Sequence, residues 1–272
     1  MAFKIGFAAT GIAKRKNTGA AFATQQIPPA PRKSVVQVKF AGRNMTLAYY
    51  NDQFDLHRGD IVYVDGKLEG LRGRVTDVNY NFKIRISDYK RVIAVVDTTV
   101  SGQFFMAGSH FITFDRTALP AGKAASWFKA PEKEEEEFAS GFDDTAFHLH
   151  DLSGMNVSAL IAERGHEYYT ENRVRYICMD GRKGYAIVEG SEAYEVEFEY
   201  HKGEISQLTC SCYCSYNCKH EFAVMLQLKE TLKWIEKHCA DEYERTGYFV
   251  AVDKSALFAF AIEDKEMGSF TL

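Results

Sequence analysis

The densest cluster of metal-binding side chains lies between Cys210 and His220, where the sequence reads C-S-C-Y-C-S-Y-N-C-K-H. Four thiols and one imidazole fall within these eleven residues. Zn²⁺ prefers four soft or borderline ligands in a tetrahedron, and the Cys-x-Cys and Cys-x-His spacings each bring two ligands to one tight turn. We therefore expect one structural zinc ion bound by Cys210, Cys212, Cys218 and His220.

The remaining cysteine of this cluster, Cys214, leaves the ligand set open. An alternative set is Cys212, Cys214, Cys218 and His220, which has only three residues between its two pairs. Cys214 is otherwise a bystander, a nucleophile beside His220, or the labile thiol of a redox or zinc sensor. A disulfide cluster is the other interpretation, but intracellular thiols stay reduced. Structural zinc is the interpretation that we adopt.

The pattern C-x-C…C-K-H, followed by E-F-A-V-M-L-Q-L, resembles a SWIM-type zinc finger, whose pattern is C-x-C-x(n)-C-x-H. The resemblance covers roughly residues 156–232, where R-G-H-E-Y-Y, V-R-Y-I and I-S-Q-L-T-C-S-C match the helix and strands of that family. The spacer between Cys212 and Cys218 has five residues, which is shorter than the family usually shows, and it contains Cys214.

This resemblance implies a module of bacterial helicase-like ATPases, Mutator-type transposases and ubiquitin-pathway proteins, where it is taken to bind DNA or proteins. The sequence contains no ATPase or transposase core. The resemblance therefore implies a stand-alone adaptor that works in trans with an enzyme such as a helicase-like ATPase.

Charge is distributed unevenly along the 272 residues, although the net charge is only −4. Residues 1–50 contain eight Lys and Arg and no acid, whereas residues 131–272 contain fourteen basic and twenty-eight acidic residues. This asymmetry predicts that the N-terminal half meets anions. The N-terminus lacks the features of a signal peptide, and no window approaches the roughly 20 apolar residues of a membrane span. We expect a cytoplasmic protein with no membrane contact.

Residues 1–33 are expected to form a flexible basic arm, in which Lys14, Arg15 and Lys16 are candidates for contact with nucleic acid phosphates. Residues 34–130 are expected to form a small β-barrel-like domain, because short β-branched and aromatic runs alternate with turn formers. The expected strands are 35–40, 45–50, 60–64, 72–78, 82–87 and 92–96, with one or two more at 104–114. The phrase L-H-R-G-D-I-V-Y-V…G-L-R-G-R-V-T-D-V is similar to SH3-like barrels, including those with a KOW motif.

Basic residues in this domain occur as pairs two residues apart, and aromatic residues lie among them. Arg72 and Arg74, like Lys83 and Arg85, should share one sheet face. A basic face with interleaved aromatic side chains suits phosphate attraction and base stacking, so these four residues are candidates for binding DNA or RNA. The alternative is an ordinary solvated face with acidic partners on neighbouring strands.

The run P-E-K-E-E-E-E predicts an acidic linker at residues 131–146. Residues 147–272, which follow it, are expected to form an α+β, SWIM-like zinc domain. A helix should begin near residue 156 and stop at Gly165, and strands should follow at 174–179, 184–189, 193–200 and 205–209. After His220 an apolar stripe at three- and four-residue steps predicts a helix to about His238. Residues 247–272 suggest a closing β-hairpin or meander.

The sequence contains no G-x-x-x-x-G-K-[ST], G-x-G-x-x-G after a strand, H-E-x-x-H or G-x-S-x-G motif. A Cys₃His zinc site is usually closed, whereas catalytic zinc keeps a position open for water. We therefore expect an α+β protein that is not an enzyme and has no evident small-molecule substrate. The leading hypothesis is a nucleic-acid-binding zinc adaptor, and the alternative is a scaffold for protein interactions.

Overall fold

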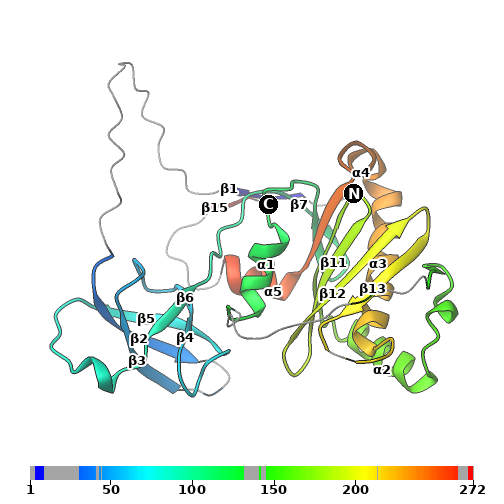
Figure 1. The fold of residues 1–272 in the computed structure, drawn as a ribbon. Coiled ribbons are helices and arrows are strands. Elements are labelled where there is room, and N and C mark those ends of the chain that lie inside the picture. Colours follow the sequence, from blue (N-terminus) through cyan, green and yellow to red (C-terminus); the bar gives the residue numbers. More distant parts are fainter. Residues whose placement is uncertain are drawn as a thin grey trace, which may run out of the picture.

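The structure is a computed structural model that describes residues 4–8, 31–40, 43, 45–131, 141, 145–212, 214–262 and 269–271 (Figure 1). The strands are β1 Lys4–Ala8, β2 Ser34–Phe40, β3 Met45–Asn51, β4 Ile61–Val64, β5 Arg72–Asn79, β6 Val92–Val95, β7 Gly102–Ala107, β8 His110–Thr113, β9 Phe147–His148, β10 Val174–Asp180, β11 Lys183–Glu189, β12 Ala193–His201, β13 Glu204–Cys210, β14 Tyr248–Asp253 and β15 Ser269–Thr271. The helices are α1 Ala121–Phe128, α2 Ala159–Thr170, α3 Lys219–His238, α4 Ala240–Thr246 and α5 Lys254–Ala261. The α+β class expected from the sequence is confirmed.

Five strands form a small sheet in the order β3-β2-β5-β4-β6. In the described residues, its two edges are joined by an isolated parallel bridge between Tyr50 and Arg91 and not by a strand ladder, so the expected barrel is not closed. The strand expected at 82–87 is absent, and a short 3₁₀ turn at Ile86–Asp88 stands there. The carboxamide of Asn79 accepts a hydrogen bond from the backbone N–H of Asn81, which turns the chain away from the sheet.

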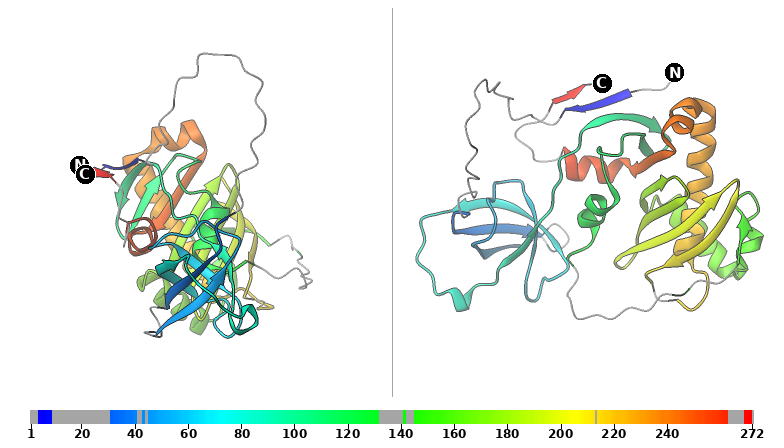
Figure 2. Two further views of the ribbon diagram at one scale, coloured as in Figure 1. Left: turned by 90° about the vertical axis from the view of Figure 1, so that its left-hand side faces the viewer. Right: turned by 45° about the horizontal axis from the view of Figure 1, so that its top comes forward.

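Ten strands form the large sheet, in the order β15-β1-β7-β8-β14-β10-β11-β12-β13-β9. Strand β14 lies between β8 and β10 and pairs antiparallel with both. The two strands expected within 104–114 exist as β7 and β8, but they pair with each other, and β7 pairs further with β1 and β8 with β14, rather than with the small sheet. Residues 102–113 therefore belong to the large sheet, although the sequence predicted them within the first domain. Strands β1 and β15 lie side by side at the far edge (Figure 2).

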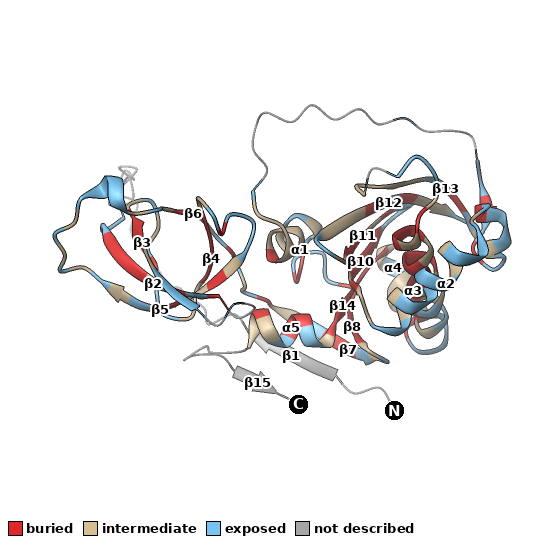
Figure 3. Ribbon diagram, turned by 90° about the horizontal axis from the view of Figure 1, so that it is seen from below, coloured by how far each residue is buried: buried red, intermediate tan, exposed pale blue. Residues whose placement is uncertain are grey.

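Helices cover both faces of the centre of the large sheet. Helix α3 packs on one face, over Ile177, Met179 and Val196, and α2 lies along α3. The opposite face carries Tyr176, Val250 and the side chains of α1 and α5 packed against them. The most buried residues gather in these central strands, between the two helical layers (Figure 3). None of the helices in the described parts of the chain is long and apolar enough to cross a membrane.

Two helical expectations differ from the structure. Helix α2 begins close to the expected position, after its N-cap Ser158, but it continues through Gly165 to Thr170. Gly165 faces α3, and a Cβ at this position would lie 2.8 Å from the Cβ of Phe222. This glycine therefore permits close helix packing and does not end the helix. In the C-terminal segment β14 is confirmed, but residues 254–261 form α5, because the Asp253 carboxylate accepts the N–H of Ala256 as an N-cap.

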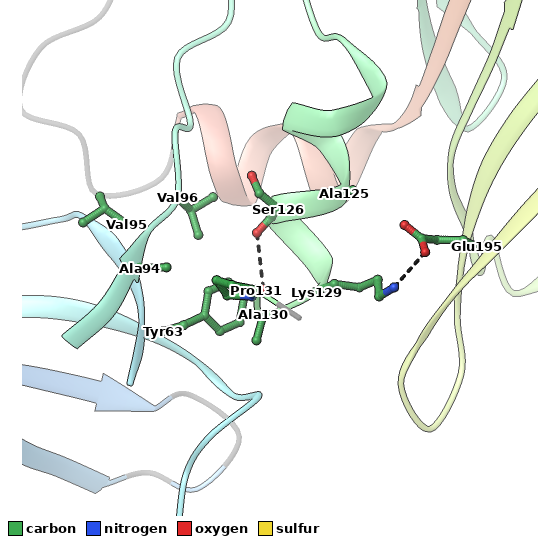
Figure 4. Close-up of a pocket in the computed structure, with 10 residues that line it drawn as sticks. All are labelled: Tyr63, Ala94, Val95, Val96, Ala125, Ser126, Lys129, Ala130, Pro131 and Glu195. Atoms are coloured by element: carbon green, nitrogen blue, oxygen red, sulfur yellow. Dashed lines mark hydrogen bonds and ion pairs between the residues drawn. The ribbon is translucent and has the colours of Figure 1, made fainter. Parts of the chain in front are cut away.

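The small sheet docks on the large unit through two arginines of β5. Arg72 donates to the backbone carbonyl of Trp127 at 2.7 Å, and its guanidinium lies 5.1 Å from the ring centre of Phe260. Arg74 donates to the carbonyl of Ala259 at 3.1 Å. Beside this junction is a mainly apolar cavity of about 340 Å³ between β6, the end of α1 and β12 (Figure 4).

Candidate metal centre

Two elements bring the four expected ligands together. Strand β13 ends at Cys210, Cys212 follows in the turn, and Cys218 is the N-cap of α3 with His220 in the first helical turn. The helix begins here because Cys218 and Glu221 form a reciprocal capping box. The N–H of Cys218 donates to Glu221 Oε2 at 2.6 Å, and the N–H of Glu221 donates to Cys218 Sγ at 3.5 Å. The structural cap thus also fixes one metal-binding sulfur.

The distances within this group match a tetrahedral metal site. The candidate ligand atoms of Cys210, Cys212, Cys218 and His220 all lie within 4.8 Å of one another. His220 Nδ1 is 3.7 Å from Cys210 Sγ and 3.7 Å from Cys218 Sγ. Tetrahedral zinc with bonds of about 2.3 Å to sulfur and 2.0–2.1 Å to nitrogen separates a sulfur from a nitrogen ligand by about 3.6 Å. The donor set and its spacing therefore fit a metal ion at the centre of the group.

The electrostatics of the group also favour a cation. A hydrogen bond from the Cys210 thiol, helped by His220, lowers the pKa of Cys218 to about 4. The same hydrogen bond, followed by burial, raises the pKa of Cys210. The hydrogen bond thus favours the thiolate at Cys218 and the thiol at Cys210. Ionising both requires nearby positive charge, which a divalent metal supplies.

Glu221 places an acidic side chain against Cys218. Burial, and then the charge of Cys218, raise the pKa of Glu221 to about 8. The carboxyl group lies against the backbone of Cys218, as the capping box requires. A bound cation would offset the repulsion between this carboxylate and the thiolate of Cys218.

Two tyrosines hold the imidazole of His220 in place. The ring of Tyr194 from β12 stacks on it, with ring centres 4.2 Å apart, and Tyr168 from α2 meets it edge-on at 5.3 Å. His220 Nε2 is buried, and no residue in the described ranges accepts a hydrogen bond from it. In most metal sites a hydrogen bond from the second ring nitrogen orients the histidine. Here the packing of the two tyrosine rings orients His220 instead. The sequence analysis did not identify Tyr168, Tyr194 or Glu221. For Glu221 the signal was present, because an acid three residues after an N-cap predicts a capping box.

Cys214 stands apart from the group of four. It is exposed to solvent, whereas Cys210 and Cys212 are half-buried and Cys218 is buried. The close group contains Cys210 and not Cys214, so the geometry favours the first ligand set over the alternative. Cys178 and Cys239 are buried and do not belong to this group. They occupy the interior as small apolar side chains do.

The predicted nucleic-acid contacts fall into three groups. Lys14, Arg15 and Lys16 lie outside the described residues, as does most of the expected linker at 131–146. Arg72 and Arg74 share one face of β5, as predicted, but their guanidinium groups contact the large unit. Lys83 and Arg85 are exposed and lie in the irregular segment before the 3₁₀ turn. Binding of nucleic acid by these residues stays a prediction.

Comparison with known proteins identified one weak relative. No family model matches the chain, and no solved structure matches it. An uncharacterized protein of Methanocaldococcus jannaschii, MJ1493, is 31% identical over 111 residues. The match covers 41% of this chain and 39% of that protein, so the chain spans about two fifths of the length of this relative. An uncharacterized relative supplies no activity that could be transferred.

Proposed function

We propose that this protein is a non-enzymatic adaptor whose C-terminal half is stabilised by one structural zinc ion. The observation that carries the proposal is the pair of 3.7 Å distances from His220 Nδ1 to the sulfurs of Cys210 and Cys218. These atoms come from a strand end and a helix start, so a metal bound there would clamp β13 to α3. The arrangement of hairpin, ligands and helix supports the SWIM-type resemblance.

A structural role fits this centre better than a catalytic one. The protein supplies four ligands, which completes the tetrahedral coordination that zinc prefers. Cys218 and His220 are 5% and 4% exposed, so this side of the centre is closed to a substrate. Catalytic zinc keeps one position for water.

Nucleic acid is the partner that we propose first. Residues 1–50 carry positive charge without acids, and Lys83 and Arg85 are exposed near them in sequence. Arg72 and Arg74 do not contribute to the proposed surface, because they hold the small sheet to the large unit. A basic surface of this kind binds phosphates with a steep dependence on salt.

A protein-interaction scaffold is the alternative, and two observations favour it. The outer face of β12 presents acids, with Glu197 exposed, and such a face repels phosphates. Tyr216, in the loop between the metal ligands, is 84% exposed. Exposed aromatic side chains on a well-anchored loop are frequent anchors of protein interfaces.

The zinc proposal is tested by metal analysis of the full-length protein. We expect one zinc ion per chain, and we expect its loss in the Cys218→Ala and His220→Ala variants. Cys178→Ala is the matched control, because Cys178 is a buried cysteine outside the group and its variant should retain one zinc ion. Full zinc content in Cys218→Ala and His220→Ala would show that the assigned ligands are wrong.

Partner binding is tested with short DNA and RNA over a range of salt concentrations. We expect the logarithm of the binding constant to fall linearly with the logarithm of the salt concentration. On B-DNA, each phosphate contact contributes about 0.9 to the slope. The double variant Lys83→Glu and Arg85→Glu should weaken binding and reduce this slope. The test requires the full chain, because β8 belongs to the large sheet and a fragment ending at residue 130 would lose its partner β14. No binding at low salt would leave the scaffold as the better proposal.

A further inference from the structure

The residues of the candidate metal centre differ in their exposure to solvent. Cys218 and His220 are buried, and the ring of Tyr194 stacks on His220. Cys212 is half-buried, and the exposed Cys214 follows it in the same loop. A solvent-borne reagent therefore reaches the centre first at this loop.

Cys212 and Cys214 are separated by one residue in the loop between β13 and α3, with Cys212 half-buried and Cys214 exposed. The described residues between Ser211 and Asn217 belong to no strand or helix. Cys210, by contrast, pairs with Val196 in the β12–β13 ladder, and Cys218 caps α3. Among the expected ligands, Cys212 can leave the centre with the least loss of regular structure.

We propose that Cys212 and Cys214 form a peroxide-sensitive dithiol that releases the metal when it is oxidised to a disulfide. The proposal rests on the zinc-binding function proposed above. It gives a chemical role to Cys214, the one cysteine of the cluster that the close group of four does not use. Oxidation would convert a four-ligand centre into one held by Cys210, Cys218 and His220.

The reaction balances with hydrogen peroxide as the oxidant. The Cys214 thiol loses its proton to water, and the sulfur attacks one peroxide oxygen; the O–O bond breaks, leaving a sulfenic acid and hydroxide. The sulfur of Cys212 then leaves the metal and attacks the sulfenic sulfur, which forms the disulfide and expels a second hydroxide. The two sulfurs together lose two electrons, the peroxide gains them, and the hydroxides take up protons to become water.

Metal release would change the structure where β13 meets α3. The sulfur of Cys218 accepts the N–H of Glu221 at the start of α3, and the imidazole of His220 packs on Tyr194 of β12. Removing the cation removes the link between the sulfur of Cys210 at the end of β13 and the ligands at the start of α3. We expect the first turn of α3 and the loop carrying Tyr216 to loosen, and a dithiol reductant with added zinc to restore them.

The test uses zinc-loaded, full-length protein treated with hydrogen peroxide, with released zinc followed by a chromogenic chelator. Zinc content is measured before treatment. The variants are Cys214→Ser and Cys214→Ala, and the control is Cys239→Ser, which removes a buried thiol outside the cluster. Disulfides are located by peptide mapping after the remaining thiols are blocked.

We expect both Cys214 variants to hold one zinc ion and to release it at least about tenfold more slowly than the wild type and the Cys239→Ser control. Peptide mapping should find the Cys212–Cys214 disulfide in the oxidised wild type. Equal release rates, or a disulfide between other cysteines, would overturn the inference. Loss of zinc from the untreated Cys214 variants would also overturn it, because Cys214 would then be a ligand. Absence of zinc from untreated wild-type protein would instead refute the proposed function itself.

Discussion

Replacing Gly165 by Ala tests how closely α2 and α3 pack beside the metal centre. The added Cβ would lie 2.8 Å from both Cβ and Cδ1 of Phe222 and 3.0 Å from the carbonyl oxygen of Lys219. Carbon atoms in favourable contact are about 3.5–4.0 Å apart. Rotation of the Phe222 side chain cannot relieve this clash, because its Cβ and the Lys219 carbonyl move only with the backbone of α3. The helices must separate.

The expected magnitude is the balance of two terms. Overpacking a close contact costs about 1–3 kcal/mol. Replacing a helical glycine by alanine returns about 1 kcal/mol. We therefore expect Gly165→Ala to lose up to about 2 kcal/mol of unfolding free energy.

Gly122→Ala is the matched control. Gly122 also lies in a helix, α1, but nothing lies within 4 Å of a Cβ built on it. This variant should gain up to about 1 kcal/mol, because it keeps the propensity term and avoids the clash. The difference between the two variants isolates the steric cost.

Thermal unfolding of the zinc-loaded proteins measures both changes. For a domain of 150–250 residues, 1 kcal/mol shifts Tm by about 2–4 °C. We expect Gly165→Ala to unfold below the wild type and Gly122→Ala above it. If both variants gained the same stability, Gly165 would not lie in a tight helix contact, and our explanation for the length of α2 would be wrong.

Three further predictions concern the core, the junction of the two sheets and the metal centre. Burial lowers the pKa of His110 below its ordinary value of 6.5, so its neutral form stabilises the fold above pH 6.5 and this stability is lost as pH falls; unfolding by urea at several pH values should show a shallower loss in His110→Gln. Arg72→Met removes the donor to the carbonyl of Trp127 and should destabilise the docked small sheet by about 1–3 kcal/mol, measured as faster hydrogen exchange in its strands. Tyr194→Leu uncovers one face of His220 and should speed zinc transfer to a chelator while one zinc ion per chain still binds.

Each of these predictions has an outcome that contradicts it. An unchanged pH slope in His110→Gln would remove this histidine as the cause of acid destabilisation. Uniformly faster exchange across both sheets in Arg72→Met would mean that the arginine supports the whole fold and not the junction. Wild-type transfer rates in Tyr194→Leu would show that stacking does not retain the metal.

The ligand cluster and its neighbouring elements could be predicted from the sequence because their determinants are local. Four ligands within eleven residues need only a strand end and a helix start to converge. The strands before them alternate regularly, with Val196 and Phe198 buried and Glu197 exposed. Helix α3 matches the apolar stripe, with Met225 and Leu228 in the core.

The errors have non-local causes. Gly165 was predicted to end a helix, but the decisive contact is with Phe222, more than fifty residues away. Arg72 and Arg74 were placed correctly on one face, yet that face meets α1 and α5, which the pattern of charges cannot show. For β7 and β8 the pattern predicts strands, but β14, the partner that joins β8 to the centre of the large sheet, lies more than a hundred residues later in the chain.

The position of β14 has a consequence for how the protein is made. Strands β10 to β13 pair with their sequence neighbours, so they can form as soon as they leave the ribosome. Strand β8 is complete at Thr113, but its partner β14 begins only at Tyr248. Until then, the edges of β8 and β10 that will pair with β14 are open and able to pair with other chains. During synthesis, two strand edges with unpaired backbone groups thus stay exposed until β14 has been made. This one late strand then pairs with both edges.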